Sequence, residues 1–200
     1  MLWKNIFDRI FSFLGLVLLF PLFIFIAVMI KIYMPGPIFF KQIRVGKGGG
    51  VFVMYKFRSM SVTHSGSSVS VSGESRITNL GKVLRKYKLD ELPELWNVLK
   101  GEMSFVGPRP DVPGFADNLV GEDRVILKLK PGLTGQASLK YREEEYILSK
   151  VSNPIEYNRN IIFPDKVKIN LVYYNNWSLY RDFKIIVFSL LSRDFEDYYK

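Results

Sequence analysis

An uncharged apolar run from Ile10 to Ile30 constrains this chain of 200 residues more than any other feature. It reads IFSFLGLVLLFPLFIFIAVMI, and a helix of this length spans about 30 Å, the thickness of a bilayer core. No small-residue cleavage site follows the run, so it does not resemble a signal peptide. The run therefore predicts a membrane helix.

Pro21 lies in the middle of this run, where a proline removes a backbone hydrogen bond and kinks a helix. Basic residues flank both ends: Lys4, Arg9, Lys31, Lys41 and Arg44. Because basic flanks stay in the cytoplasm, a helix bent at Pro21 that enters and leaves by one leaflet satisfies both ends. Proline-kinked spanning helices are common, so the residues alone favour a single span and leave the re-entrant arrangement open.

The composition narrows the class of partner. A net charge of +9 in a chain that is 48% hydrophobic points to an anionic partner at an apolar surface, as in a membrane. The absence of cysteine excludes disulfides, thiolate metal sites and a cysteine nucleophile. A non-catalytic basic protein that binds anionic lipid or nucleic acid at a membrane surface is one interpretation, although the chain has no nucleic-acid motif.

Two extended segments follow the apolar run. IFFKQIRV and VFVMYKFRSM surround GKGGG, which predicts a β-hairpin. Alternation along the second strand places Lys56 and Arg58 on one face, either as a solvated surface or as a clamp for phosphate. Segment 61–76 then predicts a loop, and its single histidine, His64, is assigned no catalytic role.

The stretch RKYKLDELPELW, residues 85–96, places three acids directly behind a basic cluster. Helical spacing predicts one helix that begins near Thr78 and a second that has Asp90 as its N-cap and ends at Gly101. Capping explains one acid but not three. A carboxylate beside Arg85 and Lys88 is expected to stay ionised and to serve as a nucleophile or a magnesium ligand, with structural capping the simpler alternative.

The second half of the chain is rich in glycine and proline. Arg109 lies between Pro108 and Pro110, and this stiff backbone suits recognition of phosphate or carboxylate, with a structural ion pair as the alternative. Gly132 and Gly135 allow close backbone approach in a second loop. The acidic run 143–145 predicts a solvated helix face, and the segment from 165 onward predicts two amphipathic helices suited to a membrane interface.

Three blocks of the sequence resemble the bacterial sugar transferase family, the monotopic phosphoglycosyl transferases that begin lipid-linked glycan assembly. They read YKFRSM, LRKYKLDELPELWNVLKGEMSFVGPRP and KPGLTGQASLKYR, and matching blocks occur in this order from about Ile10 to Asp182. The resemblance implies an α+β, mainly helical fold of the minimal catalytic length. Residues 1–34 would form a re-entrant membrane helix-break-helix. Residues 35–200 would form one catalytic domain, with a small β-hairpin, a compact core and interfacial amphipathic helices, on the cytoplasmic face of the bacterial inner membrane.

The activity that the resemblance implies is transfer of a sugar 1-phosphate from a UDP-sugar to polyprenyl (undecaprenyl) phosphate, with release of UMP and with Mg²⁺ as cofactor. It is the first membrane step in assembling a capsule, exopolysaccharide, O-antigen or glycoprotein glycan. By resemblance, Asp90 is the nucleophile that takes the phosphosugar covalently and Glu91 helps to hold magnesium. The implied phosphate and nucleotide-sugar binding positions are Lys56, Arg85, Arg109 and Arg142.

The chain departs from the family at the hinge of the N-terminal helix. Relatives carry a Ser-Pro pair there, whereas this sequence has Phe20-Pro21. The change removes a hydroxyl that could bond a backbone carbonyl freed at the bend. Because Pro21 and the basic flanks remain, the resemblance shifts the expectation from a spanning helix to a re-entrant one.

Overall fold

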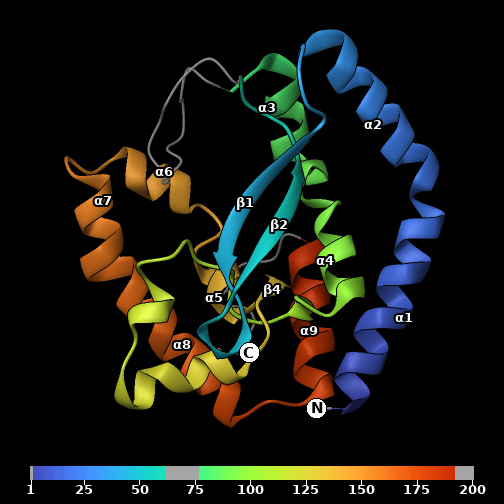
Figure 1. The fold of residues 1–200 in the computed structure, drawn as a ribbon. Helices are drawn as coiled ribbons and strands as arrows, with labels where there is room; N and C mark the ends of the chain where they lie inside the picture. The colour runs from blue at the N-terminus through green and yellow to red at the C-terminus, as the bar shows by residue number, and fades with distance from the viewer. Residues whose placement is uncertain (1, 62–76, 192–200) are drawn as a thin grey trace.

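The structure is a computed structural model that describes residues 2–61 and 77–191; the predicted loop with His64 lies outside these residues except for Ser61. The architecture is mainly helical with a small antiparallel sheet, in agreement with the predicted class. The helices α1 and α2 form an arc along one side of the molecule, the β1–β2 hairpin crosses its middle, and α7 and α8 lie on the opposite side (Figure 1).

The α-helices are α1 (Leu2–Leu18), α2 (Phe20–Tyr33), α3 (Asn79–Lys86), α4 (Glu94–Lys100), α5 (Gln136–Lys140), α6 (Glu144–Ser149), α7 (Pro154–Tyr157), α8 (Phe163–Asn175) and α9 (Leu179–Leu190). The strands are β1 (Phe39–Val45), β2 (Val51–Phe57), β3 (Ser104–Val106) and β4 (Gly132–Thr134). The 3₁₀ helices are η1 (Lys47–Gly49), η2 (Leu89–Glu91), η3 (Ala116–Asn118) and η4 (Gly121–Lys128), and η5 (Asn158–Ile162) is a π-helical turn.

The predicted kink at Pro21 is present. The helices α1 and α2 meet at Leu19 with a bend of 61°, and Pro21 lies in the first turn of α2. A proline is tolerated there because the first amides of a helix have no intrahelical partner. Within the described residues no single helix is long and apolar enough to cross a membrane, but the bent pair together reaches the required length and composition.

Helix α1 has its polar side turned inward. Lys4, Asp8 and Ser12 are buried, whereas its exposed positions include most of its large apolar side chains, such as Trp3 and Leu18. In a water-soluble protein an amphipathic helix buries its apolar stripe instead. The reversed burial on α1 leaves an apolar surface of the kind found at membrane interaction sites.

The hairpin forms as predicted, with β1 and β2 antiparallel from the pair Phe39 and Phe57 to the pair Val45 and Val51. Buried Met54 of β2 packs with Val98 and Met103, which joins the hairpin to α4. Asn97 in the middle of α4 adds a polar link, since its amide donates to Val53 O (2.7 Å) and accepts from the Tyr55 N–H (3.1 Å). The face of β2 that carries Lys56 is thereby held against the acidic stretch.

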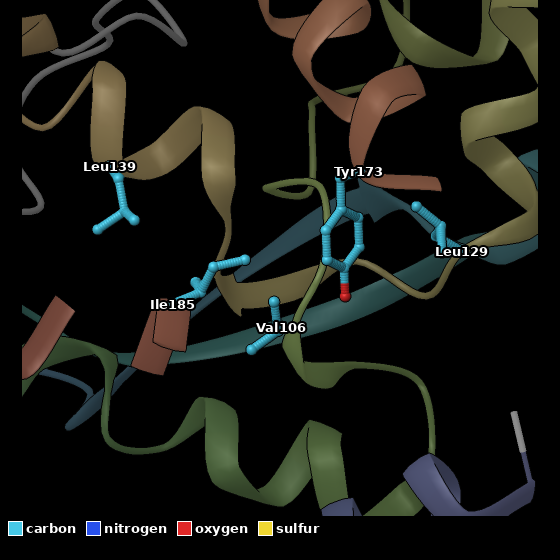
Figure 2. Close-up of a cluster of buried hydrophobic side chains, with 5 residues drawn as sticks. All are labelled: Val106, Leu129, Leu139, Tyr173 and Ile185. Carbon is cyan, nitrogen blue, oxygen red and sulfur yellow. The ribbon is translucent and has the colours of Figure 1, made fainter. Parts of the chain in front are cut away.

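Two short strands support the Gly-Pro-rich segments. The strands β3 and β4 pair in parallel, and a Cβ on Gly132 or Gly135 would collide with the backbone of Gly107. The predicted close approach of these glycines is therefore confirmed. Beside β3, which carries Val106, Tyr173 of α8 packs with Val106, Leu129, Leu139 and Ile185 (Figure 2). This cluster joins the two predicted C-terminal helices, α8 and α9, to the strand that leads into Arg109.

Candidate active site

Asp90 lies in a tight turn between α3 and α4. The helix α3 begins with the predicted cap, since the Thr78 hydroxyl accepts from the Gly81 N–H (2.9 Å). It ends at Lys86, and two residues later Lys88 has φ 56° and ψ 22° and is the one described residue other than glycine with positive φ. Such a conformation is costly for a residue with a Cβ and is typical of functional turns. Asp90 and Glu91 follow immediately in η2.

The predicted capping role of Asp90 is wrong. The helix α4 starts only at Glu94, its N-cap position is Pro93, and no side chain caps it. Asp90 is instead buried, and its Oδ1 has no hydrogen-bond partner among the described residues. The simpler structural interpretation of this acid therefore fails, because the residue lies one turn too early to bond the first amides of α4.

The pKa of Asp90 is raised, although the cations expected beside it are present. Burial raises the pKa of this carboxyl and the charge of Glu91 raises it further, while Lys56, Arg85 and Lys88 act in the opposite direction. The cations are present as predicted, but desolvation outweighs them. Asp90 is thus a desolvated carboxyl in a cationic surrounding.

Glu91 is the centre of an ion-pair cluster. Its Oε1 accepts from Lys56 Nζ (2.8 Å) on β2 and from Arg109 Nη2 (2.5 Å) after β3. Burial on its own raises the pKa of Glu91, yet the charges of Arg109, Lys56 and Lys88 outweigh burial and hold the pKa well below its usual range. The charge of Glu91 in turn raises the pKa of Arg109. Three segments far apart in the sequence therefore meet at one carboxylate oxygen.

Glu94 is a third acid at this cluster, and no role was predicted for it from the sequence. It is fully buried, with Oε1 at 3.2 Å from Lys56 Nζ but without hydrogen-bond geometry. Burial raises the pKa of Glu94 to about 7, and the nearby charge of Glu91 adds to the rise while Lys56 opposes it. A signal was present, because Glu94 lies four residues after Asp90, on the same side of a helical turn.

Arg44 is a second residue near the site whose position was not predicted from the sequence. Its Nη1 donates to Pro110 O (2.9 Å), which ties β1 to the segment that carries Arg109. Burial lowers the pKa of Arg44 and the positive charge of Arg109 lowers it further. Since residues 40, 42 and 44 pair with 56, 54 and 52, Arg44 and Lys56 share one face of the hairpin. That face therefore holds both Lys56 and the Arg109 segment in place.

The remaining predicted cations differ in whether they lie near the acidic cluster. Arg85 forms an ion pair with Glu145 of α6. Its charge also opposes the rise in the pKa of Asp90. Arg142 instead donates to Phe188 O (3.2 Å) near the end of α9, and no described contact joins it to the acidic cluster. Arg58 donates to Met34 O and Pro35 O, so it is neither solvated nor a phosphate clamp. The acidic run is not simply solvated either, because Glu144 pairs with Lys166 (2.6 Å).

The donor set suits a magnesium ion only together with a substrate. Among the described residues no three acidic or histidine side chains lie close enough to hold a metal ion by themselves. Mg²⁺ in proteins commonly takes one or two carboxylates and fills its shell with water and substrate phosphate oxygens. Glu91 and the Asp90 oxygen that has no hydrogen bond fit that pattern.

A change at Glu94 tests these electrostatics. A carboxyl whose pKa rises on folding binds more protons in the folded chain, so its contribution is fully present below the unfolded pKa of 4.5 and is lost as the pH rises through about 7. The wild type should lose unfolding free energy between pH 5 and pH 8, and Glu94→Gln should remove about 2–3 kcal/mol of this loss. Burial raises the pKa of Asp111 to about 6, so part of the slope should persist.

Thermal unfolding of the full chain in detergent at pH 5, 6.5 and 8 measures this difference. Glu122→Gln, at an exposed glutamate, is the control and should keep the wild-type slope. Equal losses of stability in the wild type and in Glu94→Gln across this range would contradict the assigned environment of Glu94.

Comparisons with known proteins identify several relatives of this chain. Relatives named UDP-glucose:undecaprenyl-phosphate glucose-1-phosphate transferase occur in Klebsiella pneumoniae (37% identical over 192 residues), Xanthomonas campestris pv. campestris (38% over 191) and Caulobacter vibrioides (36% over 199). The matches cover 93%, 92% and 96% of this chain but only 39%, 37% and 70% of those proteins, so the chain spans about two fifths of the first two.

The match to a family extends over nearly the whole chain. The sequence profile described as bacterial sugar transferase aligns with residues 1–193, which include the hairpin with Lys56, the turn with Asp90 and Glu91, and the segment with Arg109. The ion-pair cluster is therefore built from segments that all lie inside the matched region, and the chain belongs to the bacterial sugar transferase family.

Proposed function

We propose that this protein transfers a sugar 1-phosphate from a UDP-sugar to a polyprenyl phosphate, such as undecaprenyl phosphate, and releases UMP. The observation that carries the proposal is Asp90, a buried carboxyl with an unpartnered oxygen beside a Glu91 that Lys56 and Arg109 hold. The names of the relatives supply the substrate class, since they describe transfer of glucose 1-phosphate from UDP-glucose to undecaprenyl phosphate.

In the first step Asp90 attacks the phosphorus that carries the sugar. A bond forms between a carboxylate oxygen and that phosphorus, the bond from phosphorus to the bridging oxygen breaks, and UMP leaves with the electron pair. Because Oδ1 has no described hydrogen-bond partner, it has no bond to give up before it attacks. Lys56, Arg85 and Arg109 reduce the repulsion between the carboxylate and the anionic donor.

In the second step the polyprenyl phosphate replaces Asp90. A phosphate oxygen of the lipid attacks the phosphorus of the aspartyl phosphosugar, the acyl phosphate bond breaks, and the Asp90 carboxylate is released. The product is a polyprenyl diphosphate sugar, and no net proton transfer is required. Two displacements let a soluble donor and a lipid acceptor use one carboxylate in turn.

Magnesium would bind with the donor, held by Glu91 and the phosphate oxygens, and would supply positive charge at the leaving group. Glu91 is suited to this role because its low pKa keeps it ionised. Lys56 and Arg109 keep its Oε1 in a fixed place, and the diphosphate can compete with Glu91 for both cations.

The apolar outer surface of α1 and α2 supports a location at the inner membrane of a bacterium, with the site on the cytoplasmic face. Both helices expose large apolar side chains, and the 61° bend between them suits a re-entrant arrangement. In this arrangement the head-group region, where the acceptor's phosphate lies, comes to the level of the site. The product would enter assembly of a bacterial surface glycan.

Release of UMP is the direct test. The full chain in lipid vesicles with polyprenyl phosphate and Mg²⁺ is expected to release UMP from UDP-glucose, or from another member of a UDP-sugar panel, and to form an equal amount of lipid-linked sugar. Chelation of the metal with EDTA should stop the reaction, and added Mg²⁺ should restore it. Failure to turn over any UDP-sugar, or release of UMP without a lipid product, would count against the proposal.

A further inference from the structure

Helix α1 is attached to the rest of the molecule through a buried polar seam. We use this name for Lys4, Asp8 and Ser12, which are spaced four residues apart and therefore share one face of the helix. All three are buried, at 6%, 2% and 0% exposure. The opposite face of α1 is apolar and exposed, so the fully buried side chains of this helix are the polar ones of the seam.

Asp182 of α9 receives three donors at the end of this seam. Lys4 Nζ lies 2.5 Å from its Oδ2, the Tyr173 hydroxyl donates to Oδ1 (2.5 Å), and the Trp177 indole N–H donates to Oδ2 (3.1 Å). The ring of Tyr173 is held in the cluster of Figure 2, where its hydroxyl oxygen points away from the α8 backbone. A carboxylate with this many donors is satisfied although Asp182 is only 6% exposed.

The same helix contacts both segments that carry site residues. Asp8 Oδ1 accepts from the Phe105 N–H (3.2 Å) of β3, the strand that leads into Arg109. Further along, α1 packs on α4, where a Cβ on Gly15 would lie 3.4 Å from Leu95. The helix α4 directly follows Asp90 and Glu91. The contacts of α1 therefore link its orientation to the two segments of the ion-pair cluster. One is the segment with Arg109 and the other is the turn with Asp90 and Glu91.

We propose that the Lys4–Asp182 pair is a positioning device that fixes the N-terminal helix pair against the catalytic core, so that the phosphate of the lipid acceptor reaches Asp90. This inference rests on the proposed function. A buried charge without its partner is strongly disfavoured. Since rotation of α1 by one residue would turn Lys4 toward the apolar outer face, the pair permits one orientation of the helix.

Measuring the two half-reactions separately distinguishes a positioning role of the Lys4–Asp182 pair from a general effect on folding. The donor step uses a soluble substrate and needs only the ion-pair cluster. The acceptor step also needs the site at the correct depth, because the lipid phosphate stays in the head-group layer. Loosening the seam should therefore impair the second step far more than the first.

The test uses the full chain in vesicles of anionic phospholipid that contain polyprenyl phosphate. Exchange of labelled UMP into the UDP-sugar reports the donor step, and formation of lipid-linked sugar reports the complete reaction. In Asp182→Asn the transfer rate is expected to fall roughly 10- to 100-fold, the scale of a small misplacement of reacting groups. The exchange rate should stay within about threefold of the wild type.

Two further variants make the result interpretable. The double variant Lys4→Met/Asp182→Asn leaves no unpaired lysine and should recover much of the transfer that Asp182→Asn loses. Asp165→Asn is the matched control, because Asp165 also accepts from a lysine and a tyrosine, Lys140 and Tyr141 (both 2.7 Å), but joins α5 to α8. It should leave the ratio of transfer to exchange unchanged.

Depth in the bilayer is an independent measurement. The chain has no cysteine, so a nitroxide on Leu18→Cys, where Leu18 is 80% exposed, labels the end of α1 alone. We expect one narrow depth with the intact pair and a broader distribution with Asp182→Asn. A parallel fall of exchange and transfer, unchanged transfer, or unchanged depth would overturn the inference. A wild type without exchange or transfer would refute the proposed function instead, while the depth measurement would still test the seam.

Discussion

Asp90→Asn is expected to eliminate the covalent intermediate and to reduce sugar phosphate transfer by about 10³-fold or more, the scale seen when a nucleophile is removed. The amide nitrogen and oxygen of Asn are poor nucleophiles toward phosphorus. The change should not unfold the protein, because Asp90 is a buried carboxyl with a raised pKa and an unpartnered oxygen. Its melting temperature should equal or exceed that of the wild type at pH 7.

Intact-protein mass spectrometry after incubation with donor, without acceptor, checks this result. The wild type should gain the mass of one sugar phosphate, and fragmentation should place it on Asp90. Asp123→Asn, at an exposed aspartate, should form the adduct normally. An adduct on another residue, or normal turnover by Asp90→Asn, would show that the nucleophile is wrongly assigned.

Lys56→Met is expected to have the second largest effect, on both stability and activity. Lys56 lies 2.8 Å from Glu91 and 3.2 Å from Glu94, and its side chain is only 15% exposed. Its removal leaves the buried Glu94 and the partly buried Glu91 with one cation fewer, which should cost about 3–5 kcal/mol of unfolding free energy. Transfer should fall by about 100-fold or more, because in the proposed mechanism Lys56 is one of the cations that offset the charge of the donor.

The double variant Lys56→Met/Glu94→Gln distinguishes these two effects. Removal of the Glu94 charge should restore part of the stability, while transfer should stay low. Denaturant unfolding and initial rates of UMP release measure the two quantities. If the double variant were no more stable than Lys56→Met, the coupling between Lys56 and Glu94 would be refuted.

Local patterns in the sequence were sufficient for most helices and strands. The Thr78 cap, the αL residue Gly101 at the end of α4, the glycine turn of the hairpin and the kink at Pro21 are all in place. Each depends on the backbone conformation of a few consecutive residues, which side-chain chemistry restricts directly.

Burial was harder to predict than secondary structure. Leu92, Leu95, Trp96 and Leu99 recur at helical spacing, which predicts one buried apolar stripe. Trp96 is nevertheless 49% exposed, and the buried face of α4 carries Glu94 and Asn97. Helical periodicity gives the direction of a side chain but not what lies opposite it. Here β2 lies opposite α4, and its amides and Lys56 satisfy polar groups that the pattern alone places at the surface.

The sequence by itself determined the family motifs, the order of the elements, and the residue types at Lys56, Asp90, Glu91 and Arg109. Only the tertiary structure decided which cation meets which acid. In the tertiary structure Arg142 bonds to α9 instead of the acidic cluster, and the polar face of α1 is buried. Lys4 pairs there with Asp182, which is 178 residues away in the sequence. The physical reason is that charge pairing and desolvation depend on distances through space, and these are fixed only when the packed core brings remote segments together.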